Sequence, residues 1–410
     1  MRGMKRNNYP PVVVVGLNNC SLSLVRSLGR KGINVIGLYD GNSDNFFLKS
    51  RYCALKLKVK SLYDKPLVDF LLNDLATRLA KPAALFCATD MSALTISKHE
   101  DELKEMFKFV LPPYTVANDL ISKKGLHAFA LENSFLVPNT FSTNNRQEIE
   151  KIADKISYPC IIKPEFRDRL WCERVPEHKV LYADSKENLM DQIKIFQIEE
   201  TSLIIQEWID GDDSNLYFCM AYLNRSQQPL AICTGRKLRQ YPIRTGTLSV
   251  GETIWLPEIA NEAIRFLRAA GCVGFGAVEF KRSKRDGRLY VIEPTVGRPE
   301  AIAGIFTSAG LDVPFIAYLD AIGSDLEPIG YSRKKIKWIN EPLEFYSVQN
   351  YPNYGGFKDF ISVYKGKRYY SIWAYDDPLP VLIFLKEKVK KGINRVIRRG
   401  FKGKQFNNTG

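Results

Sequence analysis

Apolar runs and amphipathic stretches alternate through the first hundred residues of the chain. Apolar residues recur at helical spacing in NNCSLSLVRSLGRKG, which Gly32 closes, and in PLVDFLLNDLATRLA. Three short runs around these stretches are apolar enough to form buried strands: VVVVGL, INVIGLYD and AALFCATD. Strands joined by helical crossovers pair in parallel, so residues 1–112 are predicted to form an α/β domain with a doubly wound parallel sheet.

Two aspartates follow predicted strands of this domain. Asp40 and Asp90 end the second and the third strand, and ligands of such sheets bind beyond the carboxyl ends of the strands. The same positions also suit polar caps, so both roles stay open. The turn after Val15 holds the single glycine Gly16 in place of G-x-G-x-x-G, which gives a dinucleotide site little support.

Beyond the turn LPPY near Pro112, the pattern predicts antiparallel strands. LYFCMAYL is expected to pair with PLAICTGRKL, and VGFGAVEFKRS with GRLYVIEPTVGR around a turn near 285–287. Further strands are predicted in YPCIIKP and LIIQEWIDGDD. We therefore expect an α+β domain over 113–330, an extension over 331–379 and a basic tail over 380–410.

Charged residues interrupt three of these apolar strands. Lys163 ends CIIKP, where an isolated ammonium is costly unless an anion meets it. Glu279 and Glu293 lie on strands joined by a short hairpin, so the two carboxylates can lie side by side. A Mg²⁺ ion shared with substrate phosphates relieves their repulsion, and Arg298 offers a donor fork for phosphate oxygens. Phosphoryl transfer needs this set of groups, although a structural ion pair explains the glutamates about as well.

The order and spacing of these residues make the stretch from about Leu111 to Gly323 resemble the ATP-grasp superfamily. Lys123 precedes VPNTF as the first lysine of that family does, and Lys163 matches the second lysine. QEWIDGDD matches the strand that receives adenine. The resemblance implies a two-part ATP-grasp domain with antiparallel sheets that follows a Rossmann-like pre-ATP-grasp domain.

The resemblance also implies which residues hold ATP and its metal ion. Lys123 and Lys163 would contact the phosphates, as would Arg298. Adenine and ribose would be met by the side chain of Gln206, the backbone of Glu207 and Ile209, and the carboxylate of Asp213. The ligands of Mg²⁺, or of Mn²⁺, would be Glu279, Glu293 and Thr295.

Two departures from the family pattern affect the implied activity. The third metal ligand of the family is an asparagine, and Thr295 stands in its place. A threonine hydroxyl can also ligate magnesium. The glycine-rich loop that covers the phosphates is replaced by EFRDRLWCERVPEHKV. In this stretch, phosphate is expected to be held by the side chains of Arg167, Arg169, Arg174 and Lys179, and Trp171 either closes over the site or packs.

The phrases GRKLRQYPIRTGT and IEPTVGRPE resemble carboxylate–amine ligase-like ATP-grasp proteins of bacterial surface-polysaccharide clusters. This narrower resemblance implies that Arg236, Lys237 and Arg239 lie near the γ-phosphate or the acceptor carboxylate. The predicted function is an ADP-forming ligase that activates a carboxylate as an acyl phosphate for attack by an amine. A nucleotide-binding regulatory or scaffold protein without turnover, and a carboxylase-like use of bicarbonate, are the alternatives.

Charge and cysteine content describe the setting. Of the net charge of +14, the segment 386–404 contributes +8, from nine basic residues and one acidic residue, so no nucleic-acid partner is expected. The cysteines are scattered, and no apolar run is long enough to span a bilayer, which predicts a cytoplasmic protein. Apolar residues of the tail recur opposite the basic ones, as in a helix that contacts the anionic inner face of a membrane or docks on its own domain. The oligomeric state stays open.

Overall fold

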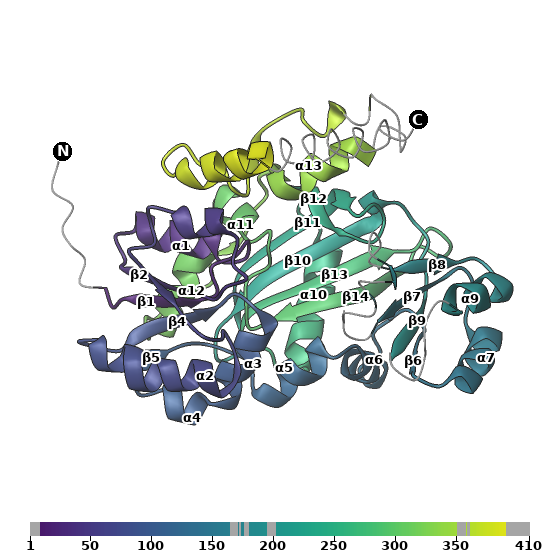
Figure 1. The fold of residues 1–410 in the computed structure, drawn as a ribbon, viewed down its shortest axis with the longest axis horizontal. Coiled ribbons are helices and arrows are strands. Elements are labelled where there is room, and N and C mark those ends of the chain that lie inside the picture. Colours follow the sequence, from purple (N-terminus) through teal and green to yellow (C-terminus); the bar gives the residue numbers. More distant parts are fainter. Residues whose placement is uncertain are drawn as a thin grey trace, which may run out of the picture.

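Three β-sheets organise the chain, with helices between and around them (Figure 1). The computed structural model describes residues 9–164, 171, 174–175, 180–194, 202–350, 358 and 361–390. Within that part of the chain, no helix is long and apolar enough to cross a membrane.

The amino-terminal sheet is parallel, as the sequence predicts, and has five strands in the order β3-β2-β1-β4-β5. Its strands are β1 (Val12–Val15), β2 (Val35–Tyr39), β3 (Leu55–Lys58), β4 (Ala83–Cys87) and β5 (Phe107–Lys108). The three inner strands are almost wholly buried because helices cover both faces of a doubly wound sheet. The edge strands β3 and β5 were not predicted, since β3 is largely exposed and β5 has two residues.

Helices α1 (Leu22–Arg30), α2 (Asp64–Asp69), α3 (Asp90–Lys98), α4 (Glu100–Leu103) and α5 (Tyr114–Ile121) accompany this sheet. The helix predicted in PLVDFLLNDLATRLA is not one regular helix. After α2 it continues as a π-helix (Phe70–Leu75) and a 3-10 turn (Ala76–Arg78). The wider turn keeps Leu67, Leu71 and Leu75, which repeat every four residues, on one buried side.

A four-stranded antiparallel sheet follows in the chain. Its order is β6-β9-β7-β8, from β6 (Thr140–Thr143), β7 (Cys160–Pro164), β8 (Leu181–Ala183) and β9 (Leu203–Glu207). Ile149 of α7 (Arg146–Lys155) and Leu189 of α9 (Lys186–Ile193) pack on Ile162 and Ile205 in its core. Helix α6 (Lys123–Glu132) precedes the sheet.

The largest sheet has eight strands in the order β14-β13-β10-β11-β12-β16-β17, with β15 beside β11. They are β10 (Leu216–Leu223), β11 (Pro229–Tyr241), β12 (Thr247–Thr253), β13 (Gly274–Arg282), β14 (Leu289–Val296), β15 (Gly330–Tyr331), β16 (Lys337–Ile339) and β17 (Arg368–Tyr370). The predicted pairs β10–β11 and β13–β14 are both antiparallel. Helices α10 (Pro257–Ala269), α11 (Gly304–Ser308) and α12 (Val313–Ala321) accompany the sheet.

Residues beyond 331, predicted as a separate extension, add β16 and β17 to this sheet. Helix α13 (Glu341–Asn350) then packs over β11 and β12, where Arg239 forms a buried ion pair with Glu344 at 2.8 Å. A last described helix, 379–390, lies along the top of the molecule near α1 (Figure 1). The extension therefore adds two strands to one edge of the large sheet and returns to the amino-terminal domain.

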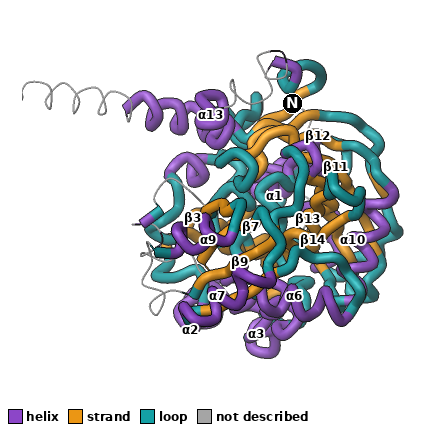
Figure 2. The backbone as a smooth tube through the Cα atoms, turned by 90° about the vertical axis from the view of Figure 1, so that its right-hand side faces the viewer, coloured by secondary structure: helices purple, strands orange, loops and turns teal. Residues whose placement is uncertain are grey.

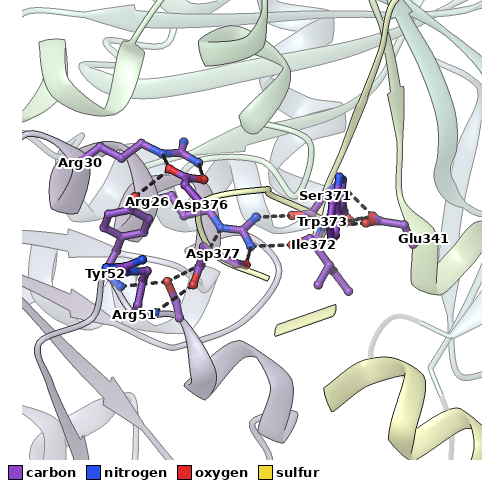
Figure 3. A network of polar contacts seen from close by, with 11 residues as sticks. Arg26, Arg30, Arg51, Tyr52, Glu341, Ser371, Ile372, Trp373, Asp376 and Asp377 are labelled. Carbon is purple, nitrogen blue, oxygen red and sulfur yellow. Dashed lines mark hydrogen bonds and ion pairs between the residues drawn. The ribbon is translucent and has the colours of Figure 1, made fainter. Parts of the chain in front are cut away.

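A polar network connects residues 371–377 with the amino-terminal domain and with α13 (Figure 3). The Arg26 side chain donates to the Asp377 carboxylate at 2.9 Å and to the Ile372 carbonyl at 2.5 Å. Arg30 binds both carboxylate oxygens of Asp376 at 2.8 Å. On the other side, the Glu341 carboxylate accepts from the backbone N–H groups of 371–373.

The Arg26–Asp377 pair predicts a large stability effect because both side chains are buried. Asp377→Asn leaves the Arg26 guanidinium without its counter-charge and should lower the free energy of unfolding by about 3 kcal/mol. Urea denaturation measures this loss.

The matched control is Asp69→Asn, which breaks the exposed pair with Lys65 and should cost less than about 1 kcal/mol. Equal losses in the two variants would contradict the role given to the buried pair.

Candidate functional site

A cavity of about 410 Å³ lies between the four-stranded sheet and the large sheet. Strands β7 and β9 line one side, and β10, β11, β13 and β14 line the other. Helix α6, the loop between β11 and β12, and the segment 298–302 complete its walls. Eight of the charged residues singled out from the sequence line this cavity.

Glu279 and Glu293 are direct partners across β13 and β14, and both line the cavity. Residues directly opposite each other in an antiparallel pair project to the same face of the sheet, with β-carbons about 5 Å apart. The Lys237 ammonium contacts Glu279 at 2.8 Å and is almost completely buried. The sheet therefore presents two adjacent carboxylates with one cation beside them.

Thr295 lies two residues after Glu293 on β14 and also lines the cavity. Its hydroxyl donates a hydrogen bond to the Glu300 carboxylate. Glu300 is a further carboxylate of the cavity wall, and the sequence did not point to it. It stands in the quoted phrase IEPTVGRPE, but nothing in that phrase indicates that the chain turns back at Gly297 to bring position 300 beside 295.

Lys163 and Lys123 reach the cavity from the smaller sheet and from α6. The Lys163 ammonium donates to the Gln206 side-chain oxygen at 2.8 Å, and the Gln206 amide donates to the Thr140 hydroxyl at 2.8 Å. The neighbouring strands β6, β9 and β7 supply these three residues, so the sheet itself aligns them. Lys123 is the first residue of α6, after the N-cap Ser122.

Lys281 is a further cation of the cavity that sequence reasoning missed. Its ammonium donates to the Gly211 carbonyl at 2.7 Å and lies 5.2 Å from the centre of the Trp208 ring. Burial lowers the pKa of Lys281 to about 8, although the nearby Asp213 carboxylate opposes this effect. Lys281 lies two residues after Glu279 on β13, and this period-two spacing could have indicated it.

Arg298 joins the cavity to the amino-terminal domain. Its guanidinium binds the Asp90 carboxylate through two nitrogens, at 2.5 Å and 3.2 Å. Burial opposes the charge of Arg298, but the Glu300 and Asp90 carboxylates raise its pKa above the ordinary value. Asp90 starts α3 at the carboxyl end of β4 and lines the cavity, whereas Asp40 is not among the lining residues.

Three of the expected site residues outside the stretch 167–179 do not line the cavity: Arg236, Arg239 and Asp213. Arg236 and Lys237 are consecutive on β11, and successive side chains of a strand point to opposite faces, so they cannot both face it. Arg236 pairs with Glu252 at 2.7 Å and is not a lining residue. Asp213 is 3% exposed and accepts a hydrogen bond from Gln240 at 2.7 Å, so its carboxylate is also held away from the lining.

The remaining expected residues of the adenine strand lie at the cavity. Gln206, Glu207 and Ile209 all line it. The Glu207 N–H donates to the Asn139 carbonyl at 2.8 Å, and its carboxylate pairs with Arg285 at 3.0 Å. The N–H of Glu207 is therefore already bonded within the protein, so the expected adenine contact cannot come from this N–H.

The stretch expected to replace the glycine-rich loop is only partly described. Lys179, like Arg167 and Arg169, lies outside the described residues. Arg174 is described and exposed. Trp171 is fully buried in the core of the four-stranded sheet, so of its two predicted roles the structure supports packing.

The loop between β11 and β12 forms a wall that the sequence reading did not predict. Arg244, Thr245 and Gly246 line the cavity there. A β-carbon on Gly246 would lie 2.0 Å from the Tyr241 carbonyl carbon, so the loop can fold back this closely only with glycine.

The described residues contain no group of three or more His, Cys, Asp or Glu side chains arranged to hold a metal ion by themselves. Two adjacent carboxylates with a hydroxyl nearby nevertheless fit Mg²⁺, which keeps several waters and uses one or two carboxylates together with substrate phosphates. Glu279 and Glu293 are the candidates, and Thr295 is less suited because its hydroxyl already binds Glu300.

Comparison with known proteins shows what this architecture is. The fold is that of ATP-grasp proteins: a parallel-sheet domain followed by two largely antiparallel sheets with the cavity between them. No family model matches the chain. Over 225 residues it is 24% identical to the D-aspartate ligase of Enterococcus faecium, a match that covers 52% of this chain and 53% of that protein. The chain thus spans about half the length of this curated relative.

Three solved structures show the same likeness at low sequence identity. N5-carboxyaminoimidazole synthetase of Staphylococcus aureus, complexed with ADP, matches with a TM-score of 0.61 and 15% identity over 81% of this chain and 82% of that chain. Biotin carboxylase of Campylobacter jejuni matches with a TM-score of 0.57 and 16% identity, over 77% of this chain and 72% of that chain. The third structure is the biotin carboxylase domain of Hydrogenobacter thermophilus 2-oxoglutarate carboxylase, solved with MgADP. It matches with a TM-score of 0.58 and 14% identity, over 78% of this chain and 71% of that chain.

The lowered pKa of Lys281 predicts how stability depends on pH. The unfolded chain binds a proton at this lysine up to about pH 10.5, whereas the folded chain releases it above about pH 8. Because the unfolded state binds more protons between these values, the contribution of Lys281 to stability increases as the pH rises through this range and is constant below it. Urea denaturation at pH 7 to 10 measures the effect against Lys281→Met. The difference between the two proteins should shift in favour of the wild type with rising pH, and parallel profiles would contradict the prediction.

Proposed function

We propose that this chain is an ATP- and Mg²⁺-dependent ligase that activates a carboxylate as an acyl phosphate for attack by an amine. The observation that carries the proposal is the direct pairing of Glu279 with Glu293 in a cavity that also holds buried lysines. Paired carboxylates for a metal ion, and cations for a polyphosphate, are the groups that phosphoryl transfer requires.

ATP would lie along the cavity with its base at the β9 end. Gln206 and Ile209, with the ring of Trp208 beside them, supply a polar side chain and apolar surface there. Lys163 and Lys281 lie where they can meet the phosphates, since both are lining residues on facing sheets. Lys123, at the start of α6, is the further phosphate contact carried over from the sequence.

Glu279 and Glu293 would hold Mg²⁺ between the carboxylates and the phosphate oxygens. When bound, the ion supplies positive charge that neutralises the phosphates as they react. Lys237 already pairs with Glu279 at 2.8 Å, so it orients that carboxylate. Of the three cations in the GRKLRQ phrase, Lys237 is the one that lines the cavity, so we assign to it the role expected of these three residues.

The proposed reaction has two steps. A carboxylate oxygen of the first substrate attacks the γ-phosphorus, the bond from that phosphorus to the β–γ bridging oxygen breaks, and ADP leaves. The amine nitrogen of the second substrate then attacks the acyl carbon, the carbon–oxygen bond to phosphate breaks, and the amine loses a proton as phosphate departs. Acyl phosphates hydrolyse readily, so the enclosed cavity must exclude water during both steps.

The substrates are proposed to bind at the Arg298 end of the cavity. Asp90, Arg298 and Glu300 gather there from two domains, with both signs of charge. A guanidinium suits a carboxylate and flanking carboxylates suit an amine. Because the matched relative is named for D-aspartate, dicarboxylic amino acids come first among the candidate substrates, followed by other amino acids and sugar acids.

One observation favours the alternative function, a nucleotide-binding regulatory or scaffold protein. The Thr295 hydroxyl, in the position of the third metal ligand, is bound to Glu300 and so is not directed at a metal. With only two carboxylate ligands for the metal ion, the protein would bind ATP but hydrolyse it slowly. Its function would then depend on the ATP-bound state and not on turnover. The bicarbonate-dependent alternative, the predicted cytoplasmic setting and the absence of a nucleic-acid partner stay predictions.

Substrate-dependent formation of ADP and phosphate separates these functions. With a candidate carboxylate and amine, the wild type should release phosphate in the presence of Mg²⁺ and stop when the metal is removed with a chelator. Glu293→Ala should lower the rate by roughly 100-fold or more, because it removes a ligand of the Mg²⁺ ion that neutralises the transferred phosphoryl group.

The matched control is Glu327→Ala, an exposed glutamate away from the cavity, which should leave the rate unchanged. Tight ATP binding without ADP formation across the whole substrate screen would favour the scaffold function. Full activity of Glu293→Ala would contradict the proposed site.

A further inference from the structure

The helix 379–390 has apolar residues on two sides. On the inner side, Val381 and Phe384 pack against Phe46 and Phe47 of the amino-terminal domain, with the rings of Phe46 and Phe384 5.4 Å apart. This contact buries one face of the helix and, with the Arg26–Asp377 pair before it, fixes the helix to the body of the protein. The second apolar side is not accounted for by this packing.

The outer side exposes a stripe of large apolar residues. Leu382 is 55% exposed, Leu385 52% and Val389 62%, and their spacing of three and four residues places them on one face of the helix. Leu379, one turn earlier, is 47% exposed. Contiguous exposed apolar residues of this kind mark an interaction site, because single exposed residues are ordinary but stripes are not.

Further exposed aromatic residues lie in the segment before the helix and on α13, which contacts the helix through Lys388. Trp373 and Tyr375, in the turn before the helix, are 47% and 88% exposed. Phe345 and Tyr346 of α13 are 49% and 39% exposed. Lys388 connects α13 with the helix, since its ammonium donates to the Tyr346 hydroxyl at 2.6 Å and lies 4.2 Å from the centre of that ring.

We call the stripe, these aromatic residues and the lysines of the helix the docking face; it comprises Phe345, Tyr346, Trp373, Tyr375, Leu379, Leu382, Leu385, Lys386, Lys388, Val389 and Lys390. The charged residues of the docking face are all basic, and the one acidic residue of the helix, Glu387, is half-buried. The sequence continues this character, because residues 386–404 carry nine basic residues and one acidic residue. The docking face is therefore apolar and strongly cationic at once.

We propose that the docking face binds the surface of an anionic lipid bilayer. Leucines and valine on one side of a basic helix enter the boundary between headgroups and acyl chains, and lysines beside them meet the anionic headgroups. Trp and Tyr side chains favour the same depth, since each has an apolar ring and a polar atom. An anionic bilayer accounts for the leucines, the exposed aromatic rings and the positive charge together.

A second copy of the chain is a poorer occupant of this face. A symmetric dimer would bring the same lysines of both copies together, and like charges at an interface are costly. A nucleic acid would meet the lysines but would leave the leucine stripe exposed to water. Because the helix is fixed to the amino-terminal domain through its inner side, the bilayer would hold the whole protein, including the cavity, at the membrane.

Co-sedimentation of the full chain with vesicles tests the proposal without any turnover. The wild type should bind vesicles that contain phosphatidylglycerol and should bind pure phosphatidylcholine vesicles much more weakly. The double variant Leu382→Asp with Leu385→Asp should lower binding to the anionic vesicles by about tenfold or more. The double variant Lys386→Glu with Lys390→Glu should also lower binding to the anionic vesicles, and this loss should be larger at low salt than at high salt.

The controls are Leu55→Asp and Leu131→Asp, which change exposed leucines of β3 and α6 and should leave vesicle binding unaltered. Trp373 supplies an independent readout: its fluorescence should shift to shorter wavelength on addition of anionic vesicles, and Trp373→Phe should abolish that shift. Melting temperature and nucleotide binding report that each variant is folded.

Three outcomes would overturn the proposal. Unchanged vesicle binding by the double leucine variant would show that the stripe takes no part. A concentration-dependent dimer that the same variant disrupts would show that a second copy, and not a bilayer, covers the stripe. Equal binding to neutral and anionic vesicles would show that the charge takes no part. Loss of ligase activity with intact vesicle binding would instead concern the cavity and leave the docking face in place.

Discussion

The pairing of β13 with β14 is the constraint on which the site depends. Glu279 lies directly opposite Glu293, so the two carboxylates share one face of the large sheet and repel each other unless a cation is near. Lys237 on β11 meets one of them at 2.8 Å. A slip of one residue in this register would turn Glu293 to the opposite face and leave Glu279 alone at the cavity. The apolar residues Val278, Phe280 and Val291 oppose such a slip, because they fill the core behind the same strands.

The cavity also depends on contacts between segments far apart in the chain. Arg298 at the end of β14 binds Asp90 at the start of α3, which places a group of the amino-terminal domain in the wall of the site. The carboxyl-terminal residues 371–377 then bridge that domain and α13 through Arg26 and Glu341 (Figure 3). In the side view of Figure 2, helices and loops surround the strands of the large sheet. Because the walls come from three parts of the chain, relative movement of those parts would change the shape of the cavity.

The sequence predicted the features that follow from local periodicity. The inner strands β1, β2 and β4 were predicted because they are apolar throughout, and the β13–β14 hairpin because its strands flank a turn. The cavity positions of Lys163, Glu279 and Glu293 followed from charges placed within such strands. The family resemblance added Lys123 and Gln206, which also line the cavity.

Other features depend on geometry that no local pattern contains. The register of β11 shifts after Lys237, so Gln240 returns to the cavity while Arg239 turns to Glu344. Simple alternation would have predicted the reverse. Glu300 reaches Thr295 only because the chain turns after β14, and the Asp90–Arg298 contact joins residues of different domains. Such turns and long-range contacts are set by tertiary packing and are not visible in the order of residues.

A structure with a non-hydrolysable ATP analogue and Mg²⁺ tests the central claim most directly. The account predicts one metal ion between the carboxylates of Glu279 and Glu293, with the phosphates of the nucleotide directed at Lys163. A nucleotide bound outside this cavity, or a metal ion that contacts neither glutamate, would contradict it.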